Sequence, residues 1–305
     1  MDRPAWTTPT IEALNDYRML PYRGSDTSYV NLFQLRHKYK LEIASHDGVL
    51  FRYYHGKNAN RQGYGFPLSS DRFDADRIFQ MIKNDAKDRG GIRFCLCDEM
   101  QKEVISKYFD IDWRTEEGDN DYIYESEKWL TFSGRKYHHL KYKLNHFNRT
   151  YDDAEYFPID SDERLADALR VSEVWQHEHT DKEMPDEDLD LEQSCITEVS
   201  KHWHELGMTG GVMYVGGSPV AMTMASFLSN DSVDFHFDKA IGEFAAAGAT
   251  VVSRRSFVAN GIAKGRQFFN LEEDMNIPGL RQSKETYRPM CKLKKYYGEA
   301  AVTSR

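Results

Sequence analysis

The spacing of apolar residues predicts several helices along the chain. Ile78, Ile82 and Ala86 recur at the interval of one helical face. Asp74 precedes them as an N-cap residue and Gly90 follows as a stop signal, so the pattern predicts a helix between these two points. The same reasoning predicts further helices over residues 99–109, 162–177, 191–206 and about 250–264.

Turn signals between short apolar runs predict strands. Residues 39–56 are expected to form a hairpin that turns at Asp47-Gly48, because this dipeptide tolerates the positive φ of such turns. The most apolar window, residues 210–228, is interrupted at 216–219 by two glycines, a serine and a proline, which predicts two strands and a tight turn. Further strands are predicted at 232–239 and 268–274.

The order of these elements predicts two similar domains. Hairpin strands and helices follow one another in a similar order in both halves, which favours one kind of α+β unit used twice. A chain of 305 residues that is 40% hydrophobic can bury two cores. We therefore expect domains at residues 1–130 and 131–305. The acidic run at 181–192 lacks periodicity and is expected to be a mobile surface loop.

Composition narrows the function classes. The net charge of -9 argues against a general nucleic-acid coat protein, whose affinity rests on many lysines and arginines, so any such partner must use a local patch. Four scattered cysteines exclude a disulfide scaffold. The chain contains neither an apolar signal-peptide region at its start nor 18 consecutive apolar residues, so we expect a soluble cytoplasmic protein with no transmembrane segment.

Two stretches are basic within this acidic chain. Residues 128–149 contain no Asp or Glu, and residues 281–295 contain one acid, Glu285. Aromatic residues are interleaved with the cations in both stretches, which is the chemistry for holding a phosphate backbone while stacking on unpaired bases. The alternative interpretation is a pair of solvated amphipathic faces.

Metal and covalent chemistry are not indicated by the motifs. His177 and His179, like His202 and His204, are two residues apart in helical segments and point to different faces, so no metal site is expected. His236 is interpreted as a packed strand histidine that shares a face with Asp238. Neither a serine nucleophile elbow nor a cysteine with a histidine partner is found. A glycine-containing turn at 245–250 precedes a helix, but it lacks the leading Arg or Gln of an acyl-CoA phosphate site.

Three blocks of sequence carry a resemblance to a known family. They are DYIYESEKWLTFSGRKYHHLKYKLNHF, SVDFHFDKA and FFNLEEDMNIPGLRQSKETYRP. Together they resemble the phosphatidylglycerol lysyltransferase C-terminal-domain family, and SYVNLFQLRHKY and YGFPL extend the resemblance to its stand-alone soluble members. The resemblance implies two tandem domains of the GNAT (acyl-CoA N-acyltransferase) fold, each a mixed sheet flanked by helices, related to the Fem-type aminoacyl transferases.

The chain also departs from the family pattern at several positions. Lys141-Tyr142 stands where the family tends to have Arg-Asn, Leu271 where it usually has Arg, and Asp238 where Glu is common. The membrane domain of the large lipid-modifying synthases is not part of this sequence, so their lipid acceptor is not carried over.

The resemblance implies an acyl-group transferase of the aminoacyl-tRNA-dependent type. Such an enzyme would move an aminoacyl group from charged tRNA to an amine or hydroxyl acceptor, whether a small molecule, a peptide or a lipid head group. No cofactor is expected, because aminoacyl-tRNA is the donor substrate. The alternatives are an acyl-CoA-dependent N-acetyltransferase, or a non-catalytic relative that binds tRNA or a partner protein.

Candidate site residues follow from the closing block and from strand spacing. Asn270, Glu272 and Asp274 would line one face of a strand, and a Pro-Gly turn would bring Arg281 and Lys284 back toward them. We expect the two acids to hold an ammonium or cationic side chain of the aminoacyl group, and the two cations to hold phosphate or an acceptor carboxylate. The alternative is an internal ion-pair network that closes the second domain.

The remaining assignments concern catalysis and tRNA binding. Asp238 is the expected base, and Lys239 is expected to support charge at the leaving oxygen. Four residues of the first basic stretch are assigned to tRNA or phosphate binding: Arg135, Lys136, Lys141 and Lys143.

Overall fold

The chain folds into two compact units. The computed structural model describes residues 3–180 and 186–300. The first unit contains the described residues of 1–121 and 293–305, and the second contains those of 122–292. Each unit is built around its own mixed sheet. The expected α+β class, with two mixed sheets flanked by helices, is confirmed.

The first unit contains a six-stranded sheet with the order β1-β2-β3-β4-β13-β5. Its strands are β1 (Glu42–His46), β2 (Val49–His55), β3 (Gln62–Tyr64), β4 (Arg93–Cys97), β5 (Ile111–Thr115) and β13 (Tyr296–Ala300). Its helices are α1 (Ile11–Leu14), α2 (Tyr29–Gln34), α3 (Ala75–Asp85) and α4 (Glu99–Ile105). Short 3-10 turns cover Asn15–Tyr17, Ser25–Thr27, Ala59–Arg61 and Glu117–Asp119.

Local sequence signals account for much of this unit. The predicted hairpin is confirmed: β1 and β2 pair antiparallel around Asp47 and Gly48, whose φ angles are 49° and 73°. The predicted helix after Asp74 is also confirmed, since the Asp74 side chain accepts a hydrogen bond from the amide of Arg77 at the start of α3. Both features depend only on residues close in sequence.

A buried ionic cluster attaches the last strand to the first unit. Lys295 pairs with Asp26 and, at 3.1 Å, with Asp121, while Arg52 lies 3.1 Å from Asp26. All four side chains are at most 7% exposed. Burial alone would lower the pKa of Lys295, but the two carboxylates outweigh it and raise the pKa. Lys295 therefore stays charged inside this unit.

The second unit contains a seven-stranded sheet with the order β12-β6-β11-β10-β9-β8-β7. Its strands are β6 (Asp121–Glu125), β7 (Glu155–Pro158), β8 (Met208–Val215), β9 (Ser218–Phe227), β10 (Ser232–Ala240), β11 (Phe268–Asn270) and β12 (Cys291–Leu293). Its helices are α5 (Ser126–Thr131), α6 (His138–Thr150), α7 (Asp162–His179), α8 (Asp186–Lys201), α9 (Gly242–Ala247), α10 (Ala249–Ala259) and α11 (Pro278–Thr286). A 3-10 turn at Arg135–Tyr137 leads into α6.

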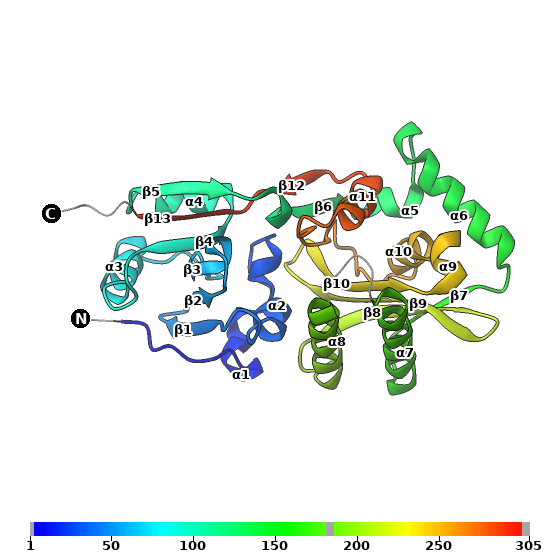
Figure 1. Cartoon of the computed structure of the whole chain (residues 1–305), viewed down its shortest axis with the longest axis horizontal. Coiled ribbons are helices and arrows are strands. Elements are labelled where there is room, and N and C mark those ends of the chain that lie inside the picture. The colour runs from blue at the N-terminus through cyan, green and yellow to red at the C-terminus, as the bar shows by residue number, and fades with distance from the viewer. Residues whose placement is uncertain (1–2, 181–185, 301–305) are drawn as a thin grey trace. The chain divides into compact units, whose positions relative to one another are not determined.

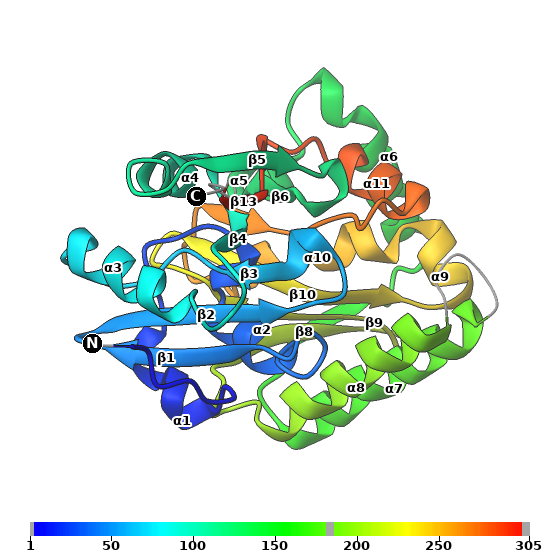
Figure 2. The same cartoon turned by 60° about the vertical axis from the view of Figure 1, so that its left-hand side comes forward.

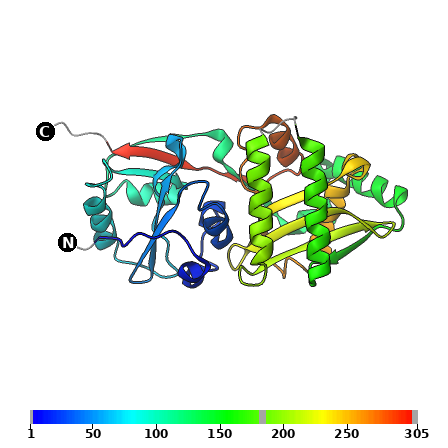
Figure 3. The same cartoon turned by 60° about the horizontal axis from the view of Figure 1, so that its bottom comes forward.

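Helices cover both faces of the second sheet. α7 and α8 lie side by side on one face (Figures 2 and 3), and α9 and α10 lie on the other (Figure 1). On the α10 side, Trp129, Phe235, Phe257 and Phe269 form the centre of an aromatic core, with ring centroids between 4.8 and 6.1 Å apart for the contacting pairs. Such rings bury large apolar areas and dominate core energetics.

The units differ from the expected division at 130/131. β6, expected in the first domain, belongs to the seven-stranded sheet, and β13, expected in the second, lies between β4 and β5 in the six-stranded sheet. The physical reason is that strand pairing joins residues far apart in sequence, which a local pattern does not specify.

The predicted loop at 181–192 is wrong over its second part. α8 begins at Asp186, so the acidic residues from there to 192 belong to a helix, while 181–185 lie outside the described residues. Leu189 is buried and lies two turns before the buried Ile196, so it extends the apolar face of this helix, and acidic residues are favourable in its first turn because they interact with the helix dipole. Among the described helices, none combines the length and apolarity needed to cross a membrane.

Replacement of Lys295 should destabilise the protein strongly. Lys295→Met leaves Asp26 and Asp121 buried with one cation fewer, and breaking such a buried pair costs about 3–5 kcal/mol. The matched control is Lys294→Met, because Lys294 is the exposed neighbour and its replacement should change stability by less than about 0.5 kcal/mol. Calorimetric unfolding measures both, and equal melting temperatures for the two variants would contradict the account.

Candidate functional site

The parallel pairing of β10 and β11 ends abruptly. Three residue pairs join the strands, from Ser232 with Phe268 to Asp234 with Asn270. β10 then continues to Ala240 beside β9, whereas the chain after Asn270 turns away, with Glu272 at φ 58°. Side chains that follow the last pair on both strands are therefore brought together at one point of the sheet.

An irregularity in β10 reverses the direction of its later side chains. The register with β9 shifts between Phe235 and Phe237, so one extra residue stands in β10. Phe235 packs in the aromatic core on the α10 side, and three residues later Asp238 also faces α10, where it binds Arg254. Regular alternation would place these two on opposite faces. The expectation that His236 shares a face with Asp238 is therefore wrong.

A polar cluster lies where the β10–β11 pairing ends. His236 Nε2 is 2.8 Å from the Ser226 hydroxyl, and His236 Nδ1 is 3.2 Å from Glu272 Oε1 and 3.8 Å from Asp234 Oδ2. The side chains of His236 and Asp234 are fully buried, and that of Glu272 is 24% exposed. Asp234 and His236 flank Phe235, so both face away from the aromatic core, toward the side that carries α7 and α8.

Lys239 lies on that same side of the sheet. Its Nζ is 2.6 Å from Glu192 of α8 and 3.4 Å from the ring centroid of Trp175 of α7. Burial lowers the pKa of Lys239, against the opposing effect of Glu192. Because Asp238 faces α10 and Lys239 faces α7 and α8, the two residues do not converge on one substrate atom. The roles of Asp238 as base and of Lys239 at the leaving oxygen therefore stay predictions, and the geometry does not allow both residues to act on one atom.

The predicted strand at 268–274 ends at Asn270. Asn270 is buried, and its Oδ1 accepts a hydrogen bond of 2.7 Å from the amide of Glu272, which turns the chain. Asn270, Glu272 and Asp274 consequently do not line one face of a strand. The cause is local, because an Asn side chain that bonds a backbone amide two residues on favours a turn over an extended strand.

Asp274 is held by contacts within the second unit. Its buried carboxylate accepts hydrogen bonds from Arg281 (2.7 and 2.9 Å), from the Tyr122 hydroxyl (2.6 Å) and from the amide of Asn276 (2.8 Å). Burial alone would raise the pKa of Asp274, but the bonds from Arg281 and Tyr122 outweigh it and lower the pKa. The predicted proximity of Asp274 and Arg281 is confirmed, and these contacts favour the internal ion-pair network over substrate binding.

Lys284 also contacts the protein itself. Its buried Nζ donates to the backbone carbonyls of Leu271 and Glu273. The Lys284 carbonyl in turn accepts a hydrogen bond from Tyr124 at 2.8 Å. Lys284 therefore fixes the turn that follows β11 from the side of α11. These contacts again favour the structural interpretation, and the substrate-binding roles of Asn270 and Glu272 stay predictions.

The two basic stretches differ in how far their cations are exposed to solvent. In the second, Lys284 and Lys295 are buried, Lys292 pairs with Glu285 at 2.6 Å, and Arg281 pairs with Asp274. Arg288 and Lys294 are exposed, but the other four cations between 281 and 295 are engaged within their own unit, which argues against a continuous surface for a phosphate backbone. Three of the six, Arg281, Lys292 and Lys295, pair with acids, and Lys284 donates to backbone carbonyls.

The first basic stretch presents an exposed stripe along α6. Leu140 and Phe147 are buried in the core of the second unit, which leaves the opposite side of the helix in solvent. Six residues on this side line a shallow hollow, and we call these residues the α6 stripe: His138, Lys141, Tyr142, Asn145, Asn148 and Arg149. Tyr142 is 58% exposed and stacks parallel to the ring of His146 with centroids 6.0 Å apart.

The four predicted phosphate-binding residues lie in or next to this helix. Arg135 and Lys136 are exposed in the preceding 3-10 turn, and Lys141 belongs to the α6 stripe. Lys143 is half-buried, because it lies against Gly248 between α9 and α10. A Cβ added to Gly248 would lie 3.2 Å from the Cβ of Lys143. Gly248 thus permits close helix packing, which gives the turn at 245–250 a structural role.

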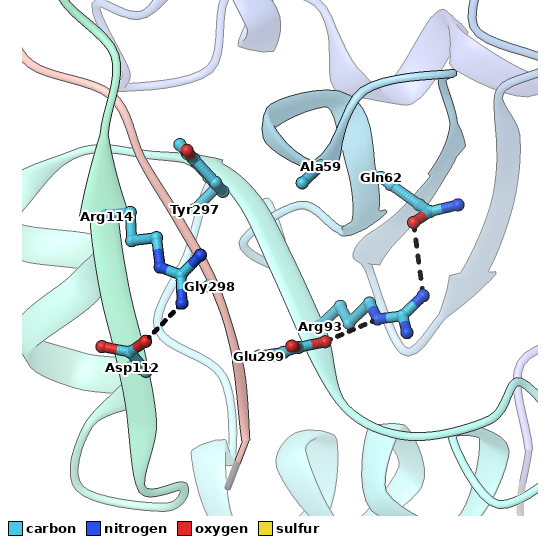
Figure 4. Close-up of a pocket in the computed structure, with 8 residues that line it drawn as sticks. All are labelled: Ala59, Gln62, Arg93, Asp112, Arg114, Tyr297, Gly298 and Glu299. Carbon is cyan, nitrogen blue, oxygen red and sulfur yellow. Dashed lines mark hydrogen bonds and ion pairs between the residues drawn. The ribbon is translucent and has the colours of Figure 1, made fainter.

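A separate cavity of about 210 Å³ lies in the first unit (Figure 4). It is lined by Ala59, Gln62, Arg93, Asp112, Arg114, Tyr297, Gly298 and Glu299. Arg93 pairs with Glu299 at 3.1 Å and Arg114 with Asp112 at 2.8 Å. Two cations and two acids cancel, so the charged residues of this cavity select neither anions nor cations.

Sequence reasoning missed several residues of the polar cluster. Asp234, Ser226 and the cluster role of His236 were not identified, and neither was Arg254, the buried partner of Asp238. The alternation of Ser232, Asp234 and His236 with apolar residues is the signal that could have indicated a polar strand face.

Comparisons with known proteins bear on the fold and the family. The family model for the C-terminal region of phosphatidylglycerol lysyltransferase matches residues 17–298. A conserved protein of unknown function from Bacteroides thetaiotaomicron VPI-5482 is 23% identical, with a TM-score of 0.85 over 97% of this chain and 99% of the other. No curated protein sequence matches the chain.

Two further solved structures share the fold. The structure of L-PGS from Bacillus licheniformis is 15% identical, with a TM-score of 0.62 over 96% of this chain and 92% of the other. FemX is 7% identical, with a TM-score of 0.59 over 97% of both chains. At these identities the likeness shows the fold alone, which is that of two mixed sheets flanked by helices.

The ion pair of Asp274 should make stability depend on pH. Because the pKa of this carboxyl is lowered in the folded state, its contribution is present above the ordinary pKa of 3.8 and is lost as pH falls through the folded value. The free-energy difference between wild type and Asp274→Asn should therefore be largest near neutrality and shrink below about pH 4. Urea unfolding across this range measures it. The exposed Asp152→Asn is the control, and a pH-independent difference for Asp274→Asn would contradict the assignment.

Proposed function

The chain belongs to the phosphatidylglycerol lysyltransferase C-terminal family, and from this premise we propose that it is an acyl-group transferase of the aminoacyl-tRNA-dependent type. It moves an aminoacyl group from charged tRNA to an amine or hydroxyl acceptor. Because charged tRNA is the proposed donor, a cytoplasmic location is part of the same proposal.

The observation that carries the tRNA part of this proposal is the α6 stripe. Lys141 and Arg149 supply charge for phosphates, Tyr142 and His146 supply rings on which bases stack, and Asn145 supplies an amide for hydrogen bonds. Recognition of RNA typically combines these three kinds of contact. Arg135 and Lys136 extend the exposed positive charge toward the start of the helix.

The β10 irregularity supports acyl transfer. Attack on the ester of aminoacyl-tRNA creates a tetrahedral oxyanion, which needs hydrogen-bond donors positioned in advance. An extra residue in a strand interrupts the ladder, and this frees backbone amides that can serve as such donors. We assign this role to the backbone around His236, next to the point where the β10–β11 pairing ends.

The two predicted catalytic residues receive different roles in this proposal. Lys239 is kept as the cation that supports charge at the leaving oxygen, since it shares the side of the sheet with the polar cluster. Asp238 is a positioning residue, because its carboxylate holds Arg254 on the opposite side. Gly248, in the turn before α10, packs against Lys143 of α6, which disfavours an acyl-CoA phosphate site at this turn.

Removal of two charges from the α6 stripe should weaken tRNA binding in a salt-dependent manner. For Lys141→Ala combined with Arg149→Ala, we expect the slope of log K against log salt to fall by roughly 1.4–1.8, because each lost phosphate contact contributes about 0.7–0.9. Filter binding of aminoacyl-tRNA at several salt concentrations measures this slope.

The matched control removes two exposed lysines elsewhere. Lys83→Ala combined with Lys201→Ala lowers the net charge equally, on α3 and α8. It should shift the affinity slightly and leave the slope nearly unchanged. Circular dichroism checks that both proteins are folded. Equal slopes for the folded wild type and the folded α6 variant would overturn the tRNA assignment of this helix.

A further inference from the structure

The polar cluster at the end of the β10–β11 pair combines three side chains of the kinds that bind metals. Asp234 and His236 come from β10, and Glu272 comes from the turn after β11. One ligand-type atom of each lies within 4.8 Å of the other two. We propose that these three residues bind a divalent first-row transition-metal ion. This assignment replaces the predicted absence of a metal site and the substrate-ammonium role expected for Glu272.

The distances between the ligand atoms suit one shared ion. Nδ1 of His236 is 3.2 Å from Glu272 Oε1 and 3.8 Å from Asp234 Oδ2. Nitrogen and oxygen ligands bind such ions at about 2.0–2.2 Å, so two ligands of one ion lie roughly 3–4.4 Å apart, depending on the angle between them. Both distances fall within this interval. The third separation, between the ligand oxygens of Asp234 and Glu272, is at most 4.8 Å, and an inward rotation of the partly exposed Glu272 brings it inside the same interval.

Ser226 orients the histidine for this role. Its hydroxyl lies 2.8 Å from His236 Nε2 and can accept the Nε2 proton, which leaves the lone pair of Nδ1 directed at the two carboxylates. Histidine ligands of metals commonly donate their other ring N–H to such a partner, which fixes both the tautomer and the ring orientation. The serine therefore acts as a positioning residue for a metal ligand.

The ligand types indicate the class of metal. One imidazole with two carboxylates suits Zn²⁺, Mn²⁺ or Fe²⁺, whereas Mg²⁺ and Ca²⁺ prefer all-oxygen sites. The site lies beside the backbone segment assigned to the oxyanion, so a bound ion would add positive charge close to that position. The metal inference rests on the three side chains alone and stands independently of the proposed transfer reaction.

The test is metal binding by the full chain in the absence of tRNA. The wild type is first dialysed against EDTA, and the EDTA is then removed by a second dialysis. Binding of ZnCl₂ is followed by calorimetry, and binding of CoCl₂ by visible absorption. We expect a stoichiometry near one and Co²⁺ bands typical of nitrogen and oxygen ligands. His236→Asn and Glu272→Gln should each weaken Zn²⁺ binding at least tenfold and remove the Co²⁺ bands.

Two features of the design keep the result interpretable. The exposed pair His202 and Glu205, 3.1 Å apart, provides the control variant His202→Ala with Glu205→Gln, which should bind like the wild type. Glu272 is partly exposed, so Glu272→Gln tests the site even if His236→Asn fails to fold. No binding by the wild type, or equal binding by wild type and Glu272→Gln, would overturn the inference. Both outcomes leave tRNA binding by α6 untouched.

Discussion

The extra residue in β10 is the constraint on which the candidate site depends. It reverses the facing of side chains partway along one strand. Before it, the strand gives an aromatic ring to the core on the α10 side, and after it the strand gives that side a carboxylate, Asp238, which needs the buried Arg254 as partner. The other side receives Asp234, His236 and Lys239. A regular strand would have distributed these charges differently and separated Lys239 from the polar cluster.

Buried ion pairs recur in both units and explain where the basic residues of this acidic chain are placed. Lys295 neutralises two acids in the first unit, while Arg281 and Lys284 hold the turn after β11 in the second. These cations fix long loops and the last strand to their sheets, and they are therefore not available for ligands. The cations of α6 differ, because the helix buries only its apolar side.

The sequence was sufficient wherever local chemistry decides the structure. The Asp47-Gly48 hairpin, the Asp74 cap and the strand pair around Gly216 and Gly217 were all predicted, since turn and cap preferences act over a few residues. The facing of His236, the end of β11 at Asn270 and the membership of β13 were not. The facing of His236 depends on a shift in strand register, and the membership of β13 depends on pairing between distant strands. β11 ends because the Asn270 side chain bonds to the backbone amide of Glu272. Periodicity alone encodes none of these. The resemblance to a family supplied the tandem fold, but it did not distinguish structural charges from functional ones.

Transfer of an aminoacyl group is the central claim, and loss of label from charged tRNA tests it most directly. The purified protein is incubated with a pool of radiolabelled aminoacyl-tRNAs and with acceptor fractions of a tRNA-free cell extract, in the presence and absence of excess acetyl-CoA. The account predicts that one kind of charged tRNA loses its label faster than by spontaneous hydrolysis, that the label appears in one acceptor fraction, and that acetyl-CoA has no effect. Loss at the spontaneous rate for every aminoacyl-tRNA, with every fraction, would contradict it.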